Sequence, residues 1–154
     1  MTAPSAAPVP PRVCGDCGLC CKIMGVEAIA KPPRKWCGHF RKGRGCSIYA
    51  ERPHACGAFN CTWLLAPNLG EDWRPDRAGF VMHSENGGLR LIVEADGADP
   101  QAWRREPYQT TLRDWARSGT AQGLEVLVFV GDRGIRLLPE GGEHPVKRGP
   151  NQSC

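Results

Sequence analysis

The stretch GFVMHSENGGLRLIVEA, residues 79–95, decides the fold of the second half of the chain. Two apolar runs flank ENGG, and this arrangement predicts a β-hairpin, because Asn and Gly readily adopt the backbone angles of tight turns. A second pair of β-rich runs flanks GDRG within residues 124–139. We therefore expect two hairpins in this half of the chain.

A helix is predicted between the two hairpins. Residues 106–119, EPYQTTLRDWARSG, place Tyr108, Leu112 and Trp115 at helical spacing, and Gly119 suits the C-terminal cap. The order of elements is then β-β-α-β-β. This order predicts an α+β fold in which a small antiparallel sheet carries one main helix on a face.

The length of 154 residues suits a single domain, flanked by two polar ends. Residues 1–12 are rich in Pro and Ala, lack the apolar core of a signal peptide, and are predicted to be a disordered lead-in. The domain, 13–139, is expected to combine a cysteine-cluster part, 13–63, with an α+β part, 64–139. We expect residues 140–154 to be a flexible tail. No run approaches the roughly 18 apolar residues of a membrane helix, so we expect a soluble cytoplasmic protein with no membrane partner.

Nine cysteines dominate the composition, and eight of them lie between residues 14 and 61, while Cys154 is C-terminal. The odd count, the crowding and the expected reducing compartment favour metal ligation over disulfides. We expect the C-terminal thiol to play no part in the site. The predicted metal ligands are Cys14, Cys17, Cys20, Cys21, Cys37, Cys46, Cys56 and Cys61.

The first four cysteines stand in CGDCGLCC, within residues 13–25, which we predict to be a loop or tight turns. Cys14 and Cys17, and again Cys17 and Cys20, have the C-x2-C spacing of a chelating pair. The same rhythm gathers thiolates around iron–sulfur clusters. Because neighbouring side chains point in different directions, Cys20 and Cys21 are not expected to share one mononuclear site. Either they serve different metals, or one of them is an unligated thiol.

The other four cysteines are more widely spaced and complete a set of eight, enough for two four-cysteine sites or for one site with thiols in reserve. His39 and His54 are weaker ligand candidates near Cys37 and Cys56. Arg52 is expected to donate to a backbone carbonyl or to a thiolate. The interleaved aromatic residues are expected to shield the metal from water, and these are Trp36, Phe40, Tyr49, Phe59 and Trp63.

The net charge of +4 is unevenly distributed. Residues 1–61 hold nine Lys/Arg and three Asp/Glu, a net charge of +6, and residues 62–154 have a net charge of −2. Two interpretations compete. The basic residues balance the negative charge that ligating thiolates leave on a metal site, or they contact nucleic acid. No recognition helix or RNP-like pattern accompanies them, so nucleic acid is not the expected partner.

These motifs resemble a known family. CGDCGLCC, WCGHF and CSIYAERPHACGAFNC are similar to the zinc- or iron-chelating CxxCxxCC domain, the YkgJ-type cysteine-cluster proteins, over residues 14–63. The resemblance implies that the eight clustered cysteines form a chelating site and leaves the metal open. A flagellin lysine N-methylase carries a similar cluster. We do not transfer methylation, because no nucleotide- or S-adenosylmethionine-binding loop is legible.

The sequence therefore predicts a cysteine-rich metal-binding segment, packed on the small antiparallel sheet, that chelates zinc or iron. Iron could also be bound as an iron–sulfur cluster. Two alternatives stay open: a structural zinc module that mediates protein or nucleic-acid interaction, and a cytoplasmic metal-handling factor. No Ser/His/Asp or paired-carboxylate arrangement is legible, so the sequence leaves open whether the protein is an enzyme.

Overall fold

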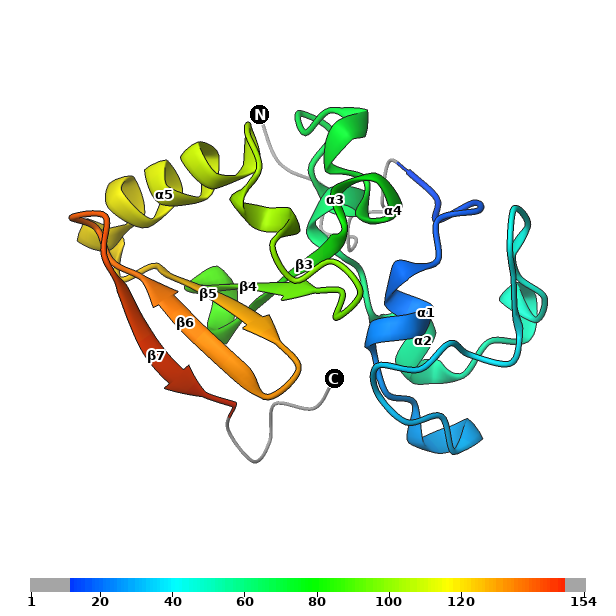
Figure 1. Ribbon diagram of the computed structural model, residues 1–154. Coiled ribbons are helices and arrows are strands. Elements are labelled where there is room, and N and C mark those ends of the chain that lie inside the picture. The colour runs from blue at the N-terminus through cyan, green and yellow to red at the C-terminus, as the bar shows by residue number, and fades with distance from the viewer. Residues whose placement is uncertain (1–11, 149–154) are drawn as a thin grey trace.

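The second half of the chain contains a five-stranded sheet (Figure 1). The computed structural model describes residues 12–148. The strands are hydrogen-bonded in sequence order, which gives a mixed α+β fold with one main helix and confirms the predicted class. The strands are β3 (Phe80–Glu85), β4 (Arg90–Ala95), β5 (Glu125–Val130), β6 (Arg133–Leu137) and β7 (Glu143–Lys147).

Both predicted hairpins are present. Strands β3 and β4 pair antiparallel, and the turn between them, η4 (Asn86–Gly88), has positive φ at all three residues. Strands β5 and β6 also pair antiparallel, around Gly131 with φ +61°. Turn residues that tolerate left-handed angles thus set both hairpins, as the sequence predicted.

The prediction of an antiparallel sheet was wrong at one strand pair, because β4 and β5 run parallel. The main helix, α5 (Tyr108–Gly119), lies between these strands in the chain. When a helix connects two neighbouring strands, it carries the chain back to the end of the sheet where the first strand began. The second strand then runs parallel to the first. Leu112 is fully buried on the sheet-facing side of α5.

Gly119 does not cap the main helix, contrary to our prediction. Its φ is −85°, and a 3-10 turn, η6 (Thr120–Gln122), continues the helical path beyond it. The left-handed cap is Gly123, with φ +84° and a hydrogen bond from its N–H to the carbonyl of Thr120. The cap therefore falls where the chain must turn into β5.

The predicted flexible tail, 140–154, was wrong over residues 143–147, which form the edge strand β7. Two arginines hold this strand: Arg104 Nη1 and Arg113 Nη2 each donate to Glu143 Oε2 at 2.8 Å. Val146 packs against a small cluster of Ile92, Leu127 and Phe129 on the sheet. The strand was missed because charges and Pro145 disguise it, and both are features of edge strands.

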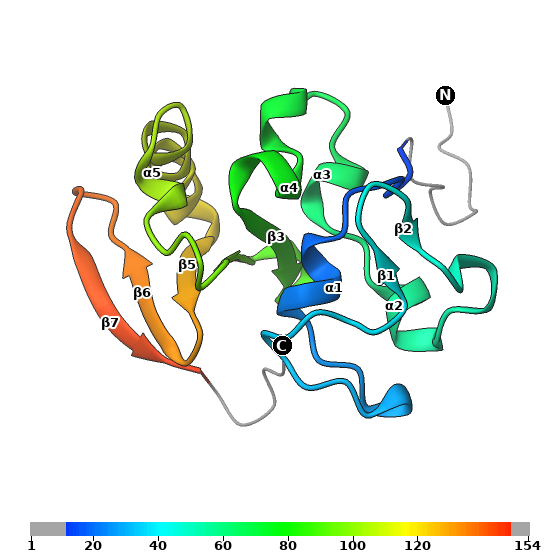
Figure 2. The same ribbon diagram turned by 45° about the vertical axis from the view of Figure 1, so that its right-hand side comes forward.

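The cysteine-rich part lies beside β3, at the opposite end of the sheet from β7 (Figures 1 and 2). Its helices α1 (Leu19–Ile23) and α3 (Thr62–Leu65), together with α4 (Pro75–Ala78), pack against β3. Residues 13–25 were predicted to be loop or turns but contain the helix α1. The elements before β3 are α1 (Leu19–Ile23), η1 (Glu27–Ile29), β1 (Phe40–Arg41), β2 (Gly45–Cys46), η2 (Tyr49–Glu51), α2 (His54–Ala58), α3 (Thr62–Leu65), η3 (Glu71–Trp73) and α4 (Pro75–Ala78); one further turn, η5 (Ala102–Arg104), precedes α5.

Hydrophobic burial is distributed very unevenly along the chain. One core cluster joins Leu19 and Ile23 of α1 to the sheet, to α5 and to an aromatic group around Trp73. Between Ile23 and Cys61, however, no hydrophobic side chain is buried. The segment 24–60 thus has no hydrophobic core of its own.

The chain ends fall partly outside the described residues. Most of the predicted lead-in, the last part of the predicted tail and Cys154 lie there. Arg12, predicted to belong to the disordered lead-in, is instead bound: its Nη1 donates to the carbonyl of Trp63 at 2.8 Å, and its guanidinium lies over the Trp63 ring. None of the helices between residues 12 and 148 is both long and apolar enough to cross a membrane.

Replacing Leu112 with alanine tests the packing of α5 on the sheet. Leu112 is 0 % exposed, so Leu112→Ala should leave a cavity and lower the free energy of unfolding by about 2–5 kcal/mol. Urea denaturation measures the change. The matched control is Arg117→Ala on the exposed side of the same helix, which should change stability by less than about 0.5 kcal/mol. Equal effects of the two variants would contradict the assigned helix face.

Candidate metal centre

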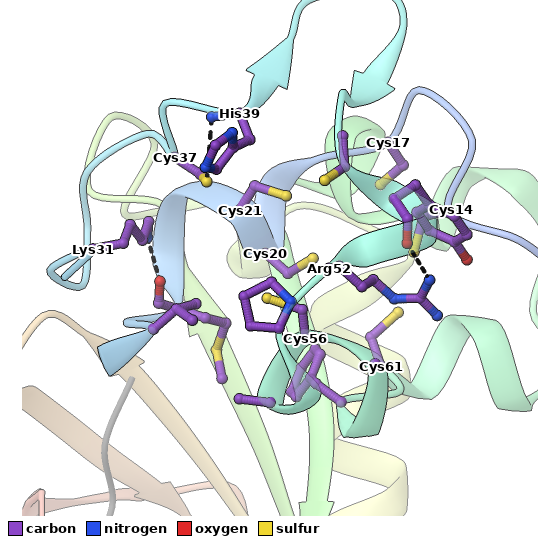
Figure 3. A pocket seen from close by; sticks show the side chains of 18 of the residues that line it. Cys14, Cys17, Cys20, Cys21, Lys31, Cys37, His39, Arg52, Cys56 and Cys61 are labelled. Carbon is purple, nitrogen blue, oxygen red and sulfur yellow. Dashed lines mark hydrogen bonds between the residues drawn. The ribbon is translucent and has the colours of Figure 1, made fainter. Parts of the chain in front are cut away.

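All eight predicted cysteines line a single cavity of about 280 Å³ (Figure 3). The polar side chains of Lys31, His39 and Arg52 line it as well. Figure 3 shows the thiols entering from several directions, because they come from the loop before α1, from α1, from the β1–β2 region, from α2 and from the start of α3. The fold therefore brings together residues from Cys14 to Cys61 that are far apart in the sequence.

The upstream cysteines are placed by one turn and one short helix. The N–H of Cys17 donates to the carbonyl of Cys14 at 2.9 Å, and Gly15 inside this turn has φ +58°. Cys20 and Cys21 follow on α1. A residue with positive φ is needed at position 15, which explains why glycine stands between the first two thiols.

The downstream cysteines are tied to the upstream ones through the backbone. The N–H of Cys37 donates to the carbonyl of Cys21 at 3.0 Å. Cys46 lies opposite Phe40 in the small antiparallel β1–β2 sheet. Cys56 lies in α2, and Cys61 is the N-terminal cap residue of α3.

Gly45 holds the β1–β2 hairpin directly against the first cysteine turn. Its φ is +90°, and a Cβ at this position would lie 2.2 Å from the carbonyl oxygen of Gly15. Only glycine fits such a backbone contact. This contact places Cys46 near the turn that carries Cys14 and Cys17.

The thiols share the cavity but do not converge on one point. Among residues 12–148, no three Cys, His, Asp or Glu side chains meet closely enough to hold a metal ion. The eight described cysteines are all free thiols. The geometry thus supplies a cluster of donors around a common space, with the sulfurs further apart than in a closed coordination shell.

Burial and mutual repulsion disfavour the thiolate form of several cysteines. Burial raises the pKa of Cys14, and the neighbouring Cys61 and Cys21 raise it further. Burial also raises the pKa values of Cys17, Cys56 and Cys61. Negative charge on neighbouring sulfurs raises the pKa values of Cys14, Cys56 and Cys61 further, as expected for thiols that surround a small space.

Cys20 and Cys21 differ in their protonation chemistry. A hydrogen bond between the two thiols lowers the pKa of Cys21 to about 7 and raises that of Cys20, and the charge of Lys31 also favours the Cys21 thiolate. Cys21 is therefore the thiol best suited to ionise first.

Lys31 brings a buried positive charge to the cavity. Its residue exposure is only 8 %, and its Nζ donates to the carbonyls of Lys22, at 2.8 Å, and of Met24. Burial lowers the pKa of Lys31, while Cys37 and Cys21 oppose this change. Nothing in the local sequence distinguishes Lys31 from its basic neighbours Arg34 and Lys35, so sequence reasoning missed it.

Two arginines supply further positive charge. The prediction for Arg52 is confirmed for the backbone acceptor, since its Nη1 donates to the carbonyl of Tyr49 at 2.6 Å. Arg74, which the sequence did not single out, pairs with Asp16 and with Asp76, and a hydrogen bond from it lowers the pKa of Cys17, although burial of that thiol outweighs the effect. The basic residues nearest the thiols thus include one from outside the cysteine-rich segment.

The two histidines that the sequence offered as weaker ligand candidates differ in position. His39 lines the cavity, and its backbone N–H points to Cys37 Sγ at 3.5 Å, whereas His54 is exposed and does not line it. Of the interleaved aromatic residues, Tyr49, Phe59 and Trp63 line the cavity. Trp36 and Phe40 instead stack on each other, with ring centroids 4.7 Å apart.

Comparison with protein-family models, with curated proteins and with solved structures gave no match. The resemblance to the CxxCxxCC domain therefore stays a prediction from the motifs.

A pair of glycine substitutions tests the close contact between Gly45 and the carbonyl of Gly15. Gly45→Ala should destabilise the β1–β2 region and make more thiols reactive toward a thiol reagent, because its Cβ would clash with the Gly15 carbonyl. Gly43→Ala is the matched control, since Gly43 also has positive φ, +79°, but has no atom within 4 Å of the new Cβ. The control should show only the cost of the backbone angle, about 1–2 kcal/mol. Equal thiol reactivity in the two variants would refute the role of this contact.

Proposed function

We propose that this protein binds zinc or iron through its eight clustered cysteines, with iron bound either as single ions or as an iron–sulfur cluster. One observation carries the proposal. All eight thiols line a single cavity, and they do so in a part of the chain that buries no hydrophobic side chain between Ile23 and Cys61.

The missing core requires another source of stability. Ordering a backbone costs about 1–2 kcal/mol per residue, and burial of apolar side chains ordinarily offsets this cost. In residues 24–60 that compensation is small, because no hydrophobic side chain is fully buried and only Met24 and Phe59 pack partly against the core. Structural zinc bound to peptides contributes roughly 10–16 kcal/mol, and this binding free energy is also folding free energy.

The chemistry of the donors supports soft metals. Thiols and one imidazole line the cavity, and no Asp or Glu of the described chain does. Sulfur donors select zinc, iron–sulfur clusters and copper(I) over magnesium or calcium, which prefer oxygen. Lys31 and Arg52 would offset part of the negative charge that thiolate ligands bring.

Binding would require the sulfurs to draw together, since no three of them meet in residues 12–148. The elements that carry them are short: β1 and β2 have two residues each, and α1 and α2 five. Because hydrophobic packing holds residues 24–60 only at Met24 and Phe59, closure onto an ion would disturb little existing structure.

The structural-module and metal-handling hypotheses use the same thiols and differ in what the metal does afterwards. A tightly retained ion would support a structural module, and an ion that passes to a competing chelator would support metal handling. A protein partner stays open in both cases. We do not propose nucleic acid as the partner.

Metal analysis of protein purified without oxygen tests the proposal directly. We expect zinc or iron in stoichiometric amount; iron with acid-labile sulfide and a broad absorption near about 400 nm would identify an iron–sulfur cluster. Zinc without colour would identify a thiolate zinc protein. Protein that is metal-free as purified, and that takes up neither metal on reconstitution under reducing conditions, would overturn the proposal.

Two Cys→Ser variants test whether metal binding depends on the cysteines that line the cavity rather than on any cysteine of the chain. Cys17→Ser should lower both the metal content and the melting temperature, because Cys17 lines the cavity and is 9 % exposed. Cys154→Ser, outside the described residues, should leave both unchanged. A loss of metal in Cys154→Ser, or none in Cys17→Ser, would show that the ligand set is wrong.

A further inference from the structure

We propose that the eight cysteines form two four-cysteine sites, each with its own metal ion, and that the two ions stabilise different parts of the protein. The inner site consists of Cys14, Cys17, Cys20 and Cys61. The outer site consists of Cys21, Cys37, Cys46 and Cys56. The inference rests on the proposed function, because it divides the ligands assigned there.

The division begins at the adjacent pair on α1. Consecutive residues of a helix project about 100° apart, so Cys20 and Cys21 face different directions. Cys20 packs against the hydrophobic core, together with its buried neighbour Leu19, whereas Cys21 does not contact that cluster. Four sulfurs around one ion must each lie about 2.3 Å from it, which two diverging neighbours do not readily satisfy. The pair is therefore the boundary between two sites.

The inner cysteines are connected to the hydrophobic core. Cys61 is 6 % exposed and belongs to the main core cluster, and Cys14 and Cys20 pack against the same cluster. Cys17 is joined to Cys14 by the hydrogen bond across their turn. The inner thiols also act on one another, since Cys61 acts on Cys14, Cys17 acts on Cys61, and both Cys14 and Cys17 act on Cys20; across the boundary, Cys21 acts on Cys14 and Cys20.

The outer cysteines are connected to one another instead. The backbone hydrogen bond at 3.0 Å joins Cys37 to Cys21, and the β1–β2 hairpin that carries Cys46 begins three residues after Cys37. The sulfurs that most strongly affect Cys56 are those of Cys21, Cys37 and Cys46. None of these four thiols packs against either hydrophobic cluster of the described chain.

Each group also has its own cation. A divalent ion with four thiolates leaves a net charge of −2, which a nearby cation stabilises. Lys31 is held by two backbone carbonyls, and Cys37 and Cys21 are the thiols that act on it most strongly. Arg74, which pairs with Asp16 in the same turn, acts electrostatically on Cys17 of the inner group. Figure 3 shows Lys31 on the Cys21 and Cys37 side of the cavity, away from Cys14 and Cys17.

The two ions should consequently have different roles. The inner ion would belong to the cooperative core, because Cys61 is part of the main core cluster and Cys14 and Cys20 pack against it. The outer ion would close only the segment 24–60, which has no core of its own. Loss of the outer ion should therefore free this segment while the sheet stays folded.

A matched pair of variants tests the division: Cys17→Ser in the inner site and Cys37→Ser in the outer site. The full chain is reconstituted with zinc under reducing conditions, and zinc content, melting temperature and tryptic cleavage are measured. The basic residues of the outer segment, from Arg34 to Arg44, report its opening as trypsin sites.

Wild-type protein should bind about two equivalents of zinc and each variant about one. Cys37→Ser should keep nearly the wild-type melting temperature but be cleaved at the sites from Arg34 to Arg44, whereas Cys17→Ser should melt at a clearly lower temperature. If either variant loses all its zinc, or if both lower the melting temperature equally, the thiols form one site and the division is overturned.

Chelator titration of the wild type decides the matter even if Cys17→Ser fails to fold. Zinc should leave in two steps, the first accompanied by tryptic cleavage of the outer segment without loss of the near-UV circular dichroism of the buried tryptophans. Release in a single step would overturn the division and leave the proposed function intact. Wild-type protein that never takes up metal would instead overturn the proposed function itself.

Discussion

An uneven distribution of apolar side chains constrains the whole structure. Buried hydrophobic residues run almost continuously from Cys61 to Leu137, and between residues 12 and 60 the buried hydrophobic residues are Cys17, Leu19 and Ile23. Leu19 and Ile23 attach the cysteine-rich part to β3 through α1. The rest of that part must be held by turns, by a two-stranded hairpin and by whatever its thiols bind.

This constraint connects the fold to the chemistry. A sheet with its own core can serve as a rigid support, and loops without a core can adapt to a ligand. The cavity lies where the two meet, with Cys61 and Trp63 on the packed side and Cys37 and Cys46 on the hairpin side. The metal ligation that we propose would contribute to such an arrangement both a link between distant segments and folding free energy.

The buried Lys31 and the partly buried Arg74 give the site its electrostatic character. Eight sulfurs around a small space repel one another once ionised, and burial in low dielectric increases that repulsion. Lys31, with 8 % exposure, and Arg74, held by two carboxylates, place positive charge close to the thiols without offering competing ligands. The positive charge of the first 61 residues thus reaches the cavity at specific positions, with help from an arginine beyond them.

The sequence by itself determined the α+β class, both hairpins, α5 and the set of eight clustered cysteines, because these depend on local periodicity, turn residues and spacing. Only the tertiary structure decided that β4 and β5 are parallel, that the polar residues 143–147 form an edge strand, and that all eight thiols line one cavity. It also decided that Lys31, among several similar basic residues, is the buried one. These features arise from contacts between distant segments, such as Glu143 with Arg104 and Gly45 with Gly15, which no local pattern encodes.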